Sequence, residues 1–127
     1  MVEEPKKRIK RVLVVDDHAS GQHLMSYVLT ELGYDYQSAW NGQEGVKRVL
    51  TEDFDLVLMD LRMPVMSGYE AVRKIRDIKK DLPIFALSAD AINDISPKCK
   101  AMGFTGTFTK PIDIDHFKKW IQGLITA

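Results

Sequence analysis

The stretch VLVVDD, residues 12–17, is the segment that decides the fold. Its four apolar residues, three of them valines, are typical of a strand that is buried on both faces of a sheet. A second run of this kind, LVLM at residues 56–59, also ends at an aspartate, Asp60. Strands of this composition predict a parallel sheet that is covered by helices on both sides.

Strand-like and helix-like segments alternate outward from these two runs. The sequence predicts strands over residues 12–15, 34–39, 56–59, 83–87 and 105–109, of which 12–15 and 56–59 are the continuous apolar runs. Apolar residues at helical spacing predict helices over residues 22–32, 44–50, 69–78, 91–102 and 113–125. Five strands alternating with five helices predict an α/β fold, a doubly wound five-stranded parallel sheet with right-handed crossovers.

The helix expected over residues 91–102 is the weakest of the five, because it contains Pro97. Proline has no backbone N–H and its ring clashes with the preceding turn of a helix. Ser96 as an N-cap would let a helix begin at Pro97 instead. We therefore expect a short or kinked helix here, with residues 91–95 irregular.

The composition suits one domain and excludes several classes of function. The 127 residues fit a basic lead over residues 1–10 and one domain over residues 11–127. Lys and Arg together number 18, as do Asp and Glu, and this balance argues against a binder of nucleic acid or of anionic membranes. The single cysteine, Cys99, excludes a disulfide framework or a zinc finger. Without a membrane-spanning run or a signal-peptide pattern, a cytoplasmic location is expected.

Polar residues with complementary chemistry follow the expected strands: Asp16-Asp17, Asp60, Ser88 and Lys110. In open parallel sheets, ligands bind beyond the carboxyl ends of the strands, so we expect these side chains on one rim. Crowded carboxylates need a cation, and a set of oxygen ligands suits Mg²⁺. A lysine at the same rim can hold a phosphoryl oxygen.

Four motifs occur in order at these strand ends: VVDD at residues 14–17, LMDLRMPVMSG at 58–68, LSA at 87–89 and KPI at 110–112. With them the sequence resembles the receiver domains of two-component response regulators over about residues 11–125, most of all those of hybrid histidine kinases. The resemblance implies a flavodoxin-like fold with strand order 2-1-3-4-5.

The resemblance also implies a role for each residue of the rim. Asp60 would accept a phosphoryl group from a phosphohistidine, and Ser88 and Lys110 would bind its oxygens. The implied Mg²⁺ ligands are Asp17, Asp60, the backbone carbonyl of Arg62 and, through water, Asp16. The Lys110-Pro111 bond is expected to be cis. Gly68 is expected to adopt a backbone conformation that a residue with a Cβ would resist.

The implied function is a switch or relay in a phosphorelay rather than an enzyme that acts on an outside substrate. The donor would be a histidine kinase or a histidine phosphotransfer protein, docked near residues 23–27. The output would go to a downstream protein or to an output domain outside this chain, and homodimerisation is left open.

Several positions depart from the family pattern or allow more than one role for the residue. Thr107 stands where the family usually has an aromatic residue, and Phe108 is expected to point to the opposite face, into the core. Arg62 and Asp90 either pair across the mouth of the site or are solvated separately. The small Ala89 would leave the acceptor accessible.

His18, next to Asp17, either tunes the acidic pocket or is an ordinary loop residue. Three rival functions are a constitutive interaction module that has lost phosphorylation, a phosphatase of the haloacid dehalogenase type and a small flavodoxin-like cofactor binder. The phosphatase would need a second aspartate at the position of Arg62. The cofactor binder would need a phosphate-binding loop where Asp16-Asp17 stands.

Overall fold

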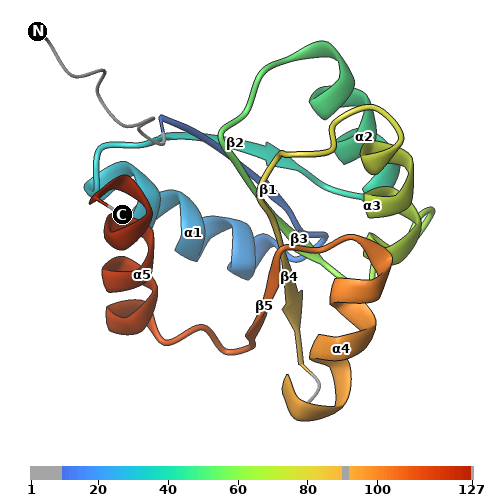
Figure 1. Cartoon of the computed structure of the whole chain (residues 1–127). Coiled ribbons are helices and arrows are strands. Elements are labelled where there is room, and N and C mark those ends of the chain that lie inside the picture. Colours follow the sequence, from blue (N-terminus) through green and yellow to red (C-terminus); the bar gives the residue numbers. More distant parts are fainter. Residues whose placement is uncertain (1–9, 90–91, 127) are drawn as a thin grey trace, which may run out of the picture.

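The fold is a central parallel sheet with helices on both faces (Figure 1). The structure is a computed structural model that describes residues 10–89 and 92–126. The strands are β1 (Arg11–Val15), β2 (Asp35–Ala39), β3 (Leu56–Asp60), β4 (Ile84–Ser88) and β5 (Gly106–Thr109). The helices are α1 (Ala19–Glu31), α2 (Gly42–Thr51), α3 (Gly68–Arg76), α4 (Ile92–Met102) and α5 (Ile114–Thr126).

The strands are hydrogen-bonded in the order β2-β1-β3-β4-β5, and all four pairings are parallel. Both the doubly wound architecture and the strand order 2-1-3-4-5 are therefore confirmed. Because the strands are parallel, their carboxyl ends lie at the same edge of the sheet. The register pairs Val15 with Met59 and Asp60 with Leu87, which aligns the residues that follow each strand.

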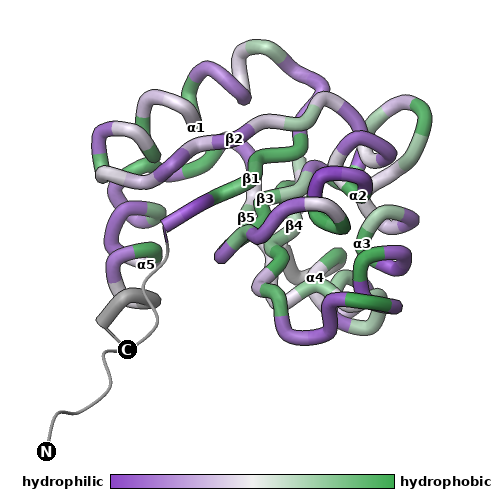
Figure 2. The backbone as a smooth tube through the Cα atoms, turned by 90° about the horizontal axis from the view of Figure 1, so that it is seen from above, coloured by the Kyte–Doolittle hydropathy of each residue, from purple (hydrophilic) through white to green (hydrophobic). Residues whose placement is uncertain are grey.

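Two hydrophobic cores lie on opposite faces of the sheet. The first, beneath α2, α3 and α4, includes Leu13, Met59 and Ile75, and the second, beneath α1 and α5, includes Val12, Leu29 and Phe117. Figure 2 shows the hydrophobic strands β1 and β3 in the middle and helices of alternating polarity around them. Strands β1 and β3 are almost fully buried, as their continuous apolar runs predict.

The expectation of a short fourth helix with residues 91–95 irregular is wrong for the described residues, whereas a kink in the helix stays a prediction. Helix α4 runs from Ile92 to Met102 with Pro97 inside it, so Ile95 is helical rather than irregular. Proline keeps a helical φ angle, and the helix continues although Pro97 lacks an N–H and its ring crowds the preceding turn. The fully buried Cys99 and the packing of α4 against β5 and α3 hold the helix on the first core. Residue Ala91 lies outside the described residues.

Helix α1 begins at Ala19, three residues before the expected start, so that His18 is its N-cap residue. Its buried face also differs from the expected one. Gln22 is 3% exposed, whereas Leu24, which the apolar spacing places inside, is 41% exposed. None of the described helices is long and apolar enough to cross a membrane.

Candidate functional site

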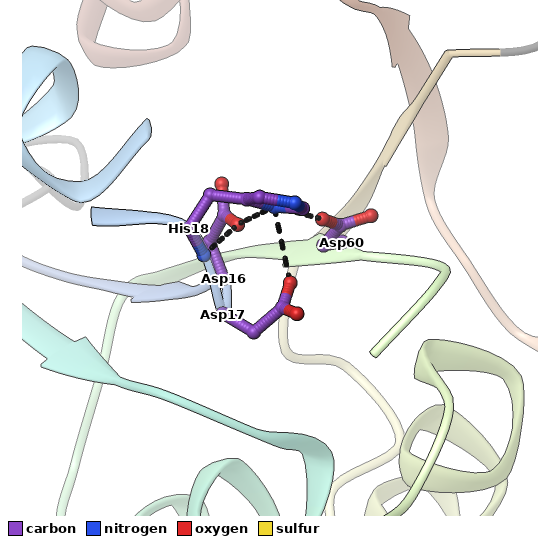
Figure 3. A group of neighbouring side chains, drawn as sticks. All are labelled: Asp16, Asp17, His18 and Asp60. Atoms are coloured by element: carbon purple, nitrogen blue, oxygen red, sulfur yellow. Dashed lines mark hydrogen bonds and ion pairs between the residues drawn. The ribbon is translucent and has the colours of Figure 1, made fainter. Parts of the chain in front are cut away.

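Three carboxylates meet at the carboxyl edge of the sheet. Asp16 and Asp17 directly follow β1, and Asp60 is the last residue of the neighbouring strand β3. Asp16 and Asp60 are buried, with 2% and 6% exposure. Ligand atoms of these three aspartates and of His18 all lie within 4.8 Å of one another (Figure 3). The sequence expectation of an acidic rim is therefore matched by the geometry.

Lys110 supplies a positive charge to this rim from the segment after β5. Its Nζ donates hydrogen bonds to Oδ2 of Asp60 at 2.9 Å and to Oδ2 of Asp16 at 3.3 Å. Burial alone would lower the pKa of Lys110, but its hydrogen bond to Asp60 and the charges of Asp60 and Asp16 raise that pKa above its usual value. The Lys110-Pro111 peptide bond is cis, as expected.

Ser88 is the buried last residue of β4, one position beyond Leu87, the register partner of Asp60. Its carbonyl accepts a hydrogen bond from the backbone N–H of Lys110 at 2.7 Å, which ties the ends of β4 and β5 together. Strands β3, β4 and the segment after β5 thus bring Asp60, Ser88 and Lys110 to one edge of the sheet.

His18 lies among the carboxylates, so it is not an ordinary loop residue. Its Nδ1 is 3.1 Å from Oδ1 of Asp16, 3.1 Å from Oδ1 of Asp17 and 3.8 Å from Oδ2 of Asp60 (Figure 3). Its backbone N–H also donates to Oδ1 of Asp16 at 2.9 Å. The adjacency of His18 to Asp17 in the sequence was the one signal for this placement.

Gln22 fixes the loop that carries the aspartates. Its side-chain amide nitrogen donates to the carbonyls of Val14 and Asp16, at the end of β1, and of Ala39, at the end of β2. The hydroxyl of Tyr36 is hydrogen-bonded to its side-chain oxygen. A glutamine on an apolar helix face therefore joins the ends of β1 and β2 by hydrogen bonds. The hydrophobic periodicity of the helix does not reveal this role.

Gly21 makes room for the Asp16 carboxylate. A Cβ at position 21 would lie 2.3 Å from Oδ2 of Asp16. That distance is far inside van der Waals contact, so any larger residue would push the carboxylate or the first turn of α1 aside. Gly21 was not among the residues that sequence reasoning selected.

Gly68 also serves close packing, for a reason that differs from the expected one. Its φ angle is not positive, so its backbone conformation is open to other residues. A Cβ at this position would instead lie 2.4 Å from the carbonyl oxygen of Asp60. In the same loop Val65 has a φ of 70°, and a hydrogen bond of 2.7 Å from the N–H of Met66 to the carbonyl of Pro64 closes a tight turn around it.

The residues present fit a divalent cation. Oδ1 of Asp17 is buried and has no hydrogen-bond partner within residues 10–89 and 92–126. A buried carboxylate oxygen without a donor is costly unless a cation contacts it. Asp16, Asp17 and Asp60 offer the oxygen ligands that Mg²⁺ prefers.

Two further residues that the sequence selected, Arg62 and Ala89, follow the ends of β3 and β4. Arg62 and Ala89 are exposed, and the backbone N–H of Arg62 donates to Oδ1 of Asp60 at 3.2 Å. Asp90, the suggested partner of Arg62, lies outside the described residues, so that pairing stays a prediction.

Thr107 and Phe108 point to opposite faces of β5, as expected. Phe108 packs in the second core, with its ring centroid 4.8 Å from that of Trp120. Thr107 is paired in register with Ala86, which belongs to the first core. Its hydroxyl oxygen is buried without a hydrogen-bond partner in the described part of the chain.

Comparisons with known proteins match this geometry to one family. The family model for the response regulator receiver domain matches residues 12–122. The sensor protein EvgS of Escherichia coli is 33% identical over 113 residues, which are 89% of this chain and 9% of that protein. The chain spans about a tenth or less of the length of the curated sensor kinases that it matches.

Solved structures agree with the sequence matches. The receiver domain of the sensor histidine kinase PA1611 from Pseudomonas aeruginosa, with a magnesium ion coordinated in its active-site cleft, has a TM-score of 0.83 at 29% identity and covers 93% of this chain and 98% of that one. The receiver domain of the Saccharomyces cerevisiae response regulator Ssk1, in complex with the histidine phosphotransfer protein Ypd1, has a TM-score of 0.86 at 30% identity, with 95% and 92% covered. The chain belongs to the response regulator receiver domain family.

Proposed function

We propose that this protein is a phosphorylation-controlled switch or relay that accepts a phosphoryl group on Asp60 with the help of Mg²⁺. The observation that carries the proposal is the convergence of Asp16, Asp17, Asp60 and Lys110 at one edge of the sheet. Among the described residues, Oδ1 of Asp17 has no hydrogen-bond partner and only an ion-pair contact with His18. The Mg²⁺ ligands would be Asp17, Asp60 and the Arg62 carbonyl, with Asp16 acting through water.

In the proposed reaction a carboxylate oxygen of Asp60 attacks the phosphorus of a phosphohistidine. The new O–P bond forms as the P–N bond breaks, and the departing imidazole keeps the electron pair of that bond and takes up a proton. Bound Mg²⁺ supplies neutralisation of the negative charge on the phosphoryl oxygens. Lys110, released from its contact with the free carboxylate, pairs with one phosphoryl oxygen, and the Ser88 hydroxyl donates to another.

The proposed donor is a histidine kinase or a histidine phosphotransfer protein that docks beside α1. A pocket of about 550 Å³ adjoins the acidic rim there, and most of its lining is apolar, with Leu24, Met25, Leu87, Pro111 and Ile112. Leu24 and Tyr27 are 41% and 67% exposed on α1, which leaves apolar surface for a partner. A helical partner with an apolar face could bring its phosphohistidine over Asp60 from this side.

Phosphotransfer from a phosphorylated histidine phosphotransfer protein tests the proposal. The wild-type protein is expected to become labelled with the transferred phosphoryl group when Mg²⁺ is present. It is expected to stay unlabelled when a chelator removes the Mg²⁺. Asp60→Asn is expected to stay unlabelled, while the matched control Asp53→Asn, whose carboxylate is fully exposed, is expected to be labelled normally. Labelling of Asp60→Asn at the wild-type rate would overturn the proposal.

The output partner would be a downstream protein or a domain outside this chain, and the receiver would take up residues 11–127.

A further inference from the structure

Helices α2 and α3 border a groove on the face of the sheet opposite α1 and α5 (Figure 1). The groove has a volume of about 400 Å³ and is lined by residues of α2, by Met66 of the loop before α3 and by Lys74 of α3. Neither Asp60 nor Lys110 lines it. The groove is therefore separate from the phosphoacceptor site.

The bottom of the groove is apolar. Val46 and Met66 are partly buried and pack on the first core, and Leu50, one turn after Val46 on α2, is 41% exposed. The buried face of α2 points elsewhere and includes Val49. Helix α2 thus carries more apolar side chains than its contact with the core buries, and the additional ones line this groove.

The two charged residues that line the groove are both lysines, Lys47 of α2 and Lys74 of α3. Neither ammonium forms an ion pair with a residue in the part of the chain that the structure describes. Arg48, the other basic residue of α2, is by contrast paired with Glu52 at 2.8 Å. The positive charge at the groove is therefore not neutralised by the fold.

The carboxylates of α3 do not line the groove. Glu70 and Asp77 line a separate depression, which shares only Lys74 with the groove. The groove therefore combines an apolar bottom with a positively charged border. Such a surface favours a partner of opposite charge, because complementary charges steer association and fix the orientation of the partner.

We propose that this groove binds an acidic amphipathic helix of a partner protein. Apolar side chains of that helix contact Val46, Leu50 and Met66, and its carboxylates pair with Lys47 and Lys74. Helices commonly bind in apolar grooves through side chains three or four residues apart. An anionic membrane is disfavoured, because the site is concave and the chain has 18 basic and 18 acidic residues. Binding here is independent of the function proposed above, because the groove contains no residue of the phosphoacceptor site.

The test uses a synthetic helical peptide with leucines at three- and four-residue spacing on one face and glutamates on both sides of them. In methyl spectra of the whole chain, the signals of Leu50 and Met66 are expected to shift and to saturate as the peptide is added. Leu50→Gln, and separately Lys47→Glu combined with Lys74→Glu, are each expected to weaken binding by at least about fivefold.

Two matched variants on the opposite face of the sheet serve as controls. Leu24→Gln changes a leucine of α1 with the same 41% exposure as Leu50, and Lys119→Glu reverses an exposed charge on α5. Both are expected to bind the peptide like the wild type. A loss of binding in Leu24→Gln but not in Leu50→Gln would place the peptide beside α1 and would overturn the proposal.

A peptide with lysines in place of the glutamates distinguishes direct pairing from damage to the fold. The variant with Lys47→Glu and Lys74→Glu is expected to bind this basic peptide more tightly than the wild type does, a gain that a distorted groove cannot produce. Equal affinity of the wild type for the acidic and the basic peptide would overturn the proposal. Binding to phosphatidylserine vesicles without binding of the acidic peptide would also overturn it.

Discussion

The Lys110 ammonium donates a 2.9 Å hydrogen bond to Oδ2 of Asp60, which joins the segment after β5 to the last residue of β3. The Asp60 side chain is 8% exposed and the Lys110 side chain 27%, so the pair is largely shielded from water. The same ammonium reaches Asp16, and one cation therefore stabilises two buried carboxylates.

Removal of Lys110 is expected to destabilise the protein when divalent ions are absent. Lys110→Met leaves both buried carboxylates without this donor, which costs about 1–3 kcal/mol of the free energy of unfolding. Urea denaturation in the presence of a chelator measures this loss in the free energy of unfolding. The loose ion pair of Lys118 and Glu31, 3.8 Å apart, offers the control Lys118→Met, expected to change stability by less than about 0.5 kcal/mol.

A double-mutant cycle distinguishes the loss of the hydrogen bond between Lys110 and Asp60 from a general loss of stability. Asp60→Asn combined with Lys110→Met should cost less than the sum of the two single changes, because each removes the same hydrogen bond. Strict additivity would contradict the account of the pair.

Gly21→Ala is expected to weaken Mg²⁺ binding. The added Cβ would lie 2.3 Å from Oδ2 of Asp16, so the carboxylate must leave its place beside Asp17 and Asp60. Displacing a residue that supports a metal site costs roughly tenfold in affinity or more. The control is Gly123→Ala in α5, where a Cβ meets nothing within 4 Å. If both variants bind Mg²⁺ like the wild type, the positioning role of Gly21 is wrong.

Gly68→Ala is expected to destabilise the protein although alanine is the better helix former. Alanine normally favours a helix by up to about 1 kcal/mol relative to glycine. Here the Cβ would lie 2.4 Å from the Asp60 carbonyl oxygen, and such overpacking costs about 1–3 kcal/mol. Thermal or urea unfolding measures the sign of the change in the free energy of unfolding. A stabilised variant would contradict the close approach of α3 to β3.

Glu52 is expected to make the stability of the protein depend on pH in the acid range. The side chains of Arg48 and Arg11 hydrogen-bond its carboxylate and lower its pKa from 4.5 to about 2. Because the pKa is lower in the folded state, the stabilisation is complete above about pH 5 and is lost as the pH falls toward 2.

Comparison of the wild type with Glu52→Gln over pH 2–7 isolates this contribution. The difference in midpoint temperature should be largest near neutral pH and should vanish near pH 2. The control Asp53→Asn, next in sequence with a fully exposed carboxylate, should show little pH-dependent difference. A Glu52→Gln difference that stays constant over the whole range would rule out the proposed coupling.

The sheet and most of the rim could be predicted from the sequence because their signals are local. Apolar runs such as residues 12–15 mark buried strands, and parallel strands place Asp16 and Asp60 at one edge whatever the details of packing. The helix through Pro97 was mispredicted because buried contacts of α4 outweigh one lost hydrogen bond.

The features that the sequence did not reveal depend on contacts between distant segments. Gln22 bonds to carbonyls at two strand ends, and the roles of Gly21 and Gly68 arise from distances to Asp16 and Asp60. The adjacency of His18 to Asp17 indicates a place near the pocket, but only the register of β1 against β3 brings it within reach of Asp60.

The central claim is that Asp60 accepts the phosphoryl group, and mapping the modified residue tests it most directly. The protein is incubated with acetyl phosphate and Mg²⁺, the acyl phosphate is reduced with borohydride, and the peptides are analysed by mass spectrometry. The account predicts one modified residue, Asp60, with no modification when Mg²⁺ is chelated. Modification at Asp16 or Asp17 instead, or none in the wild type with Mg²⁺ and donor in excess, would contradict it.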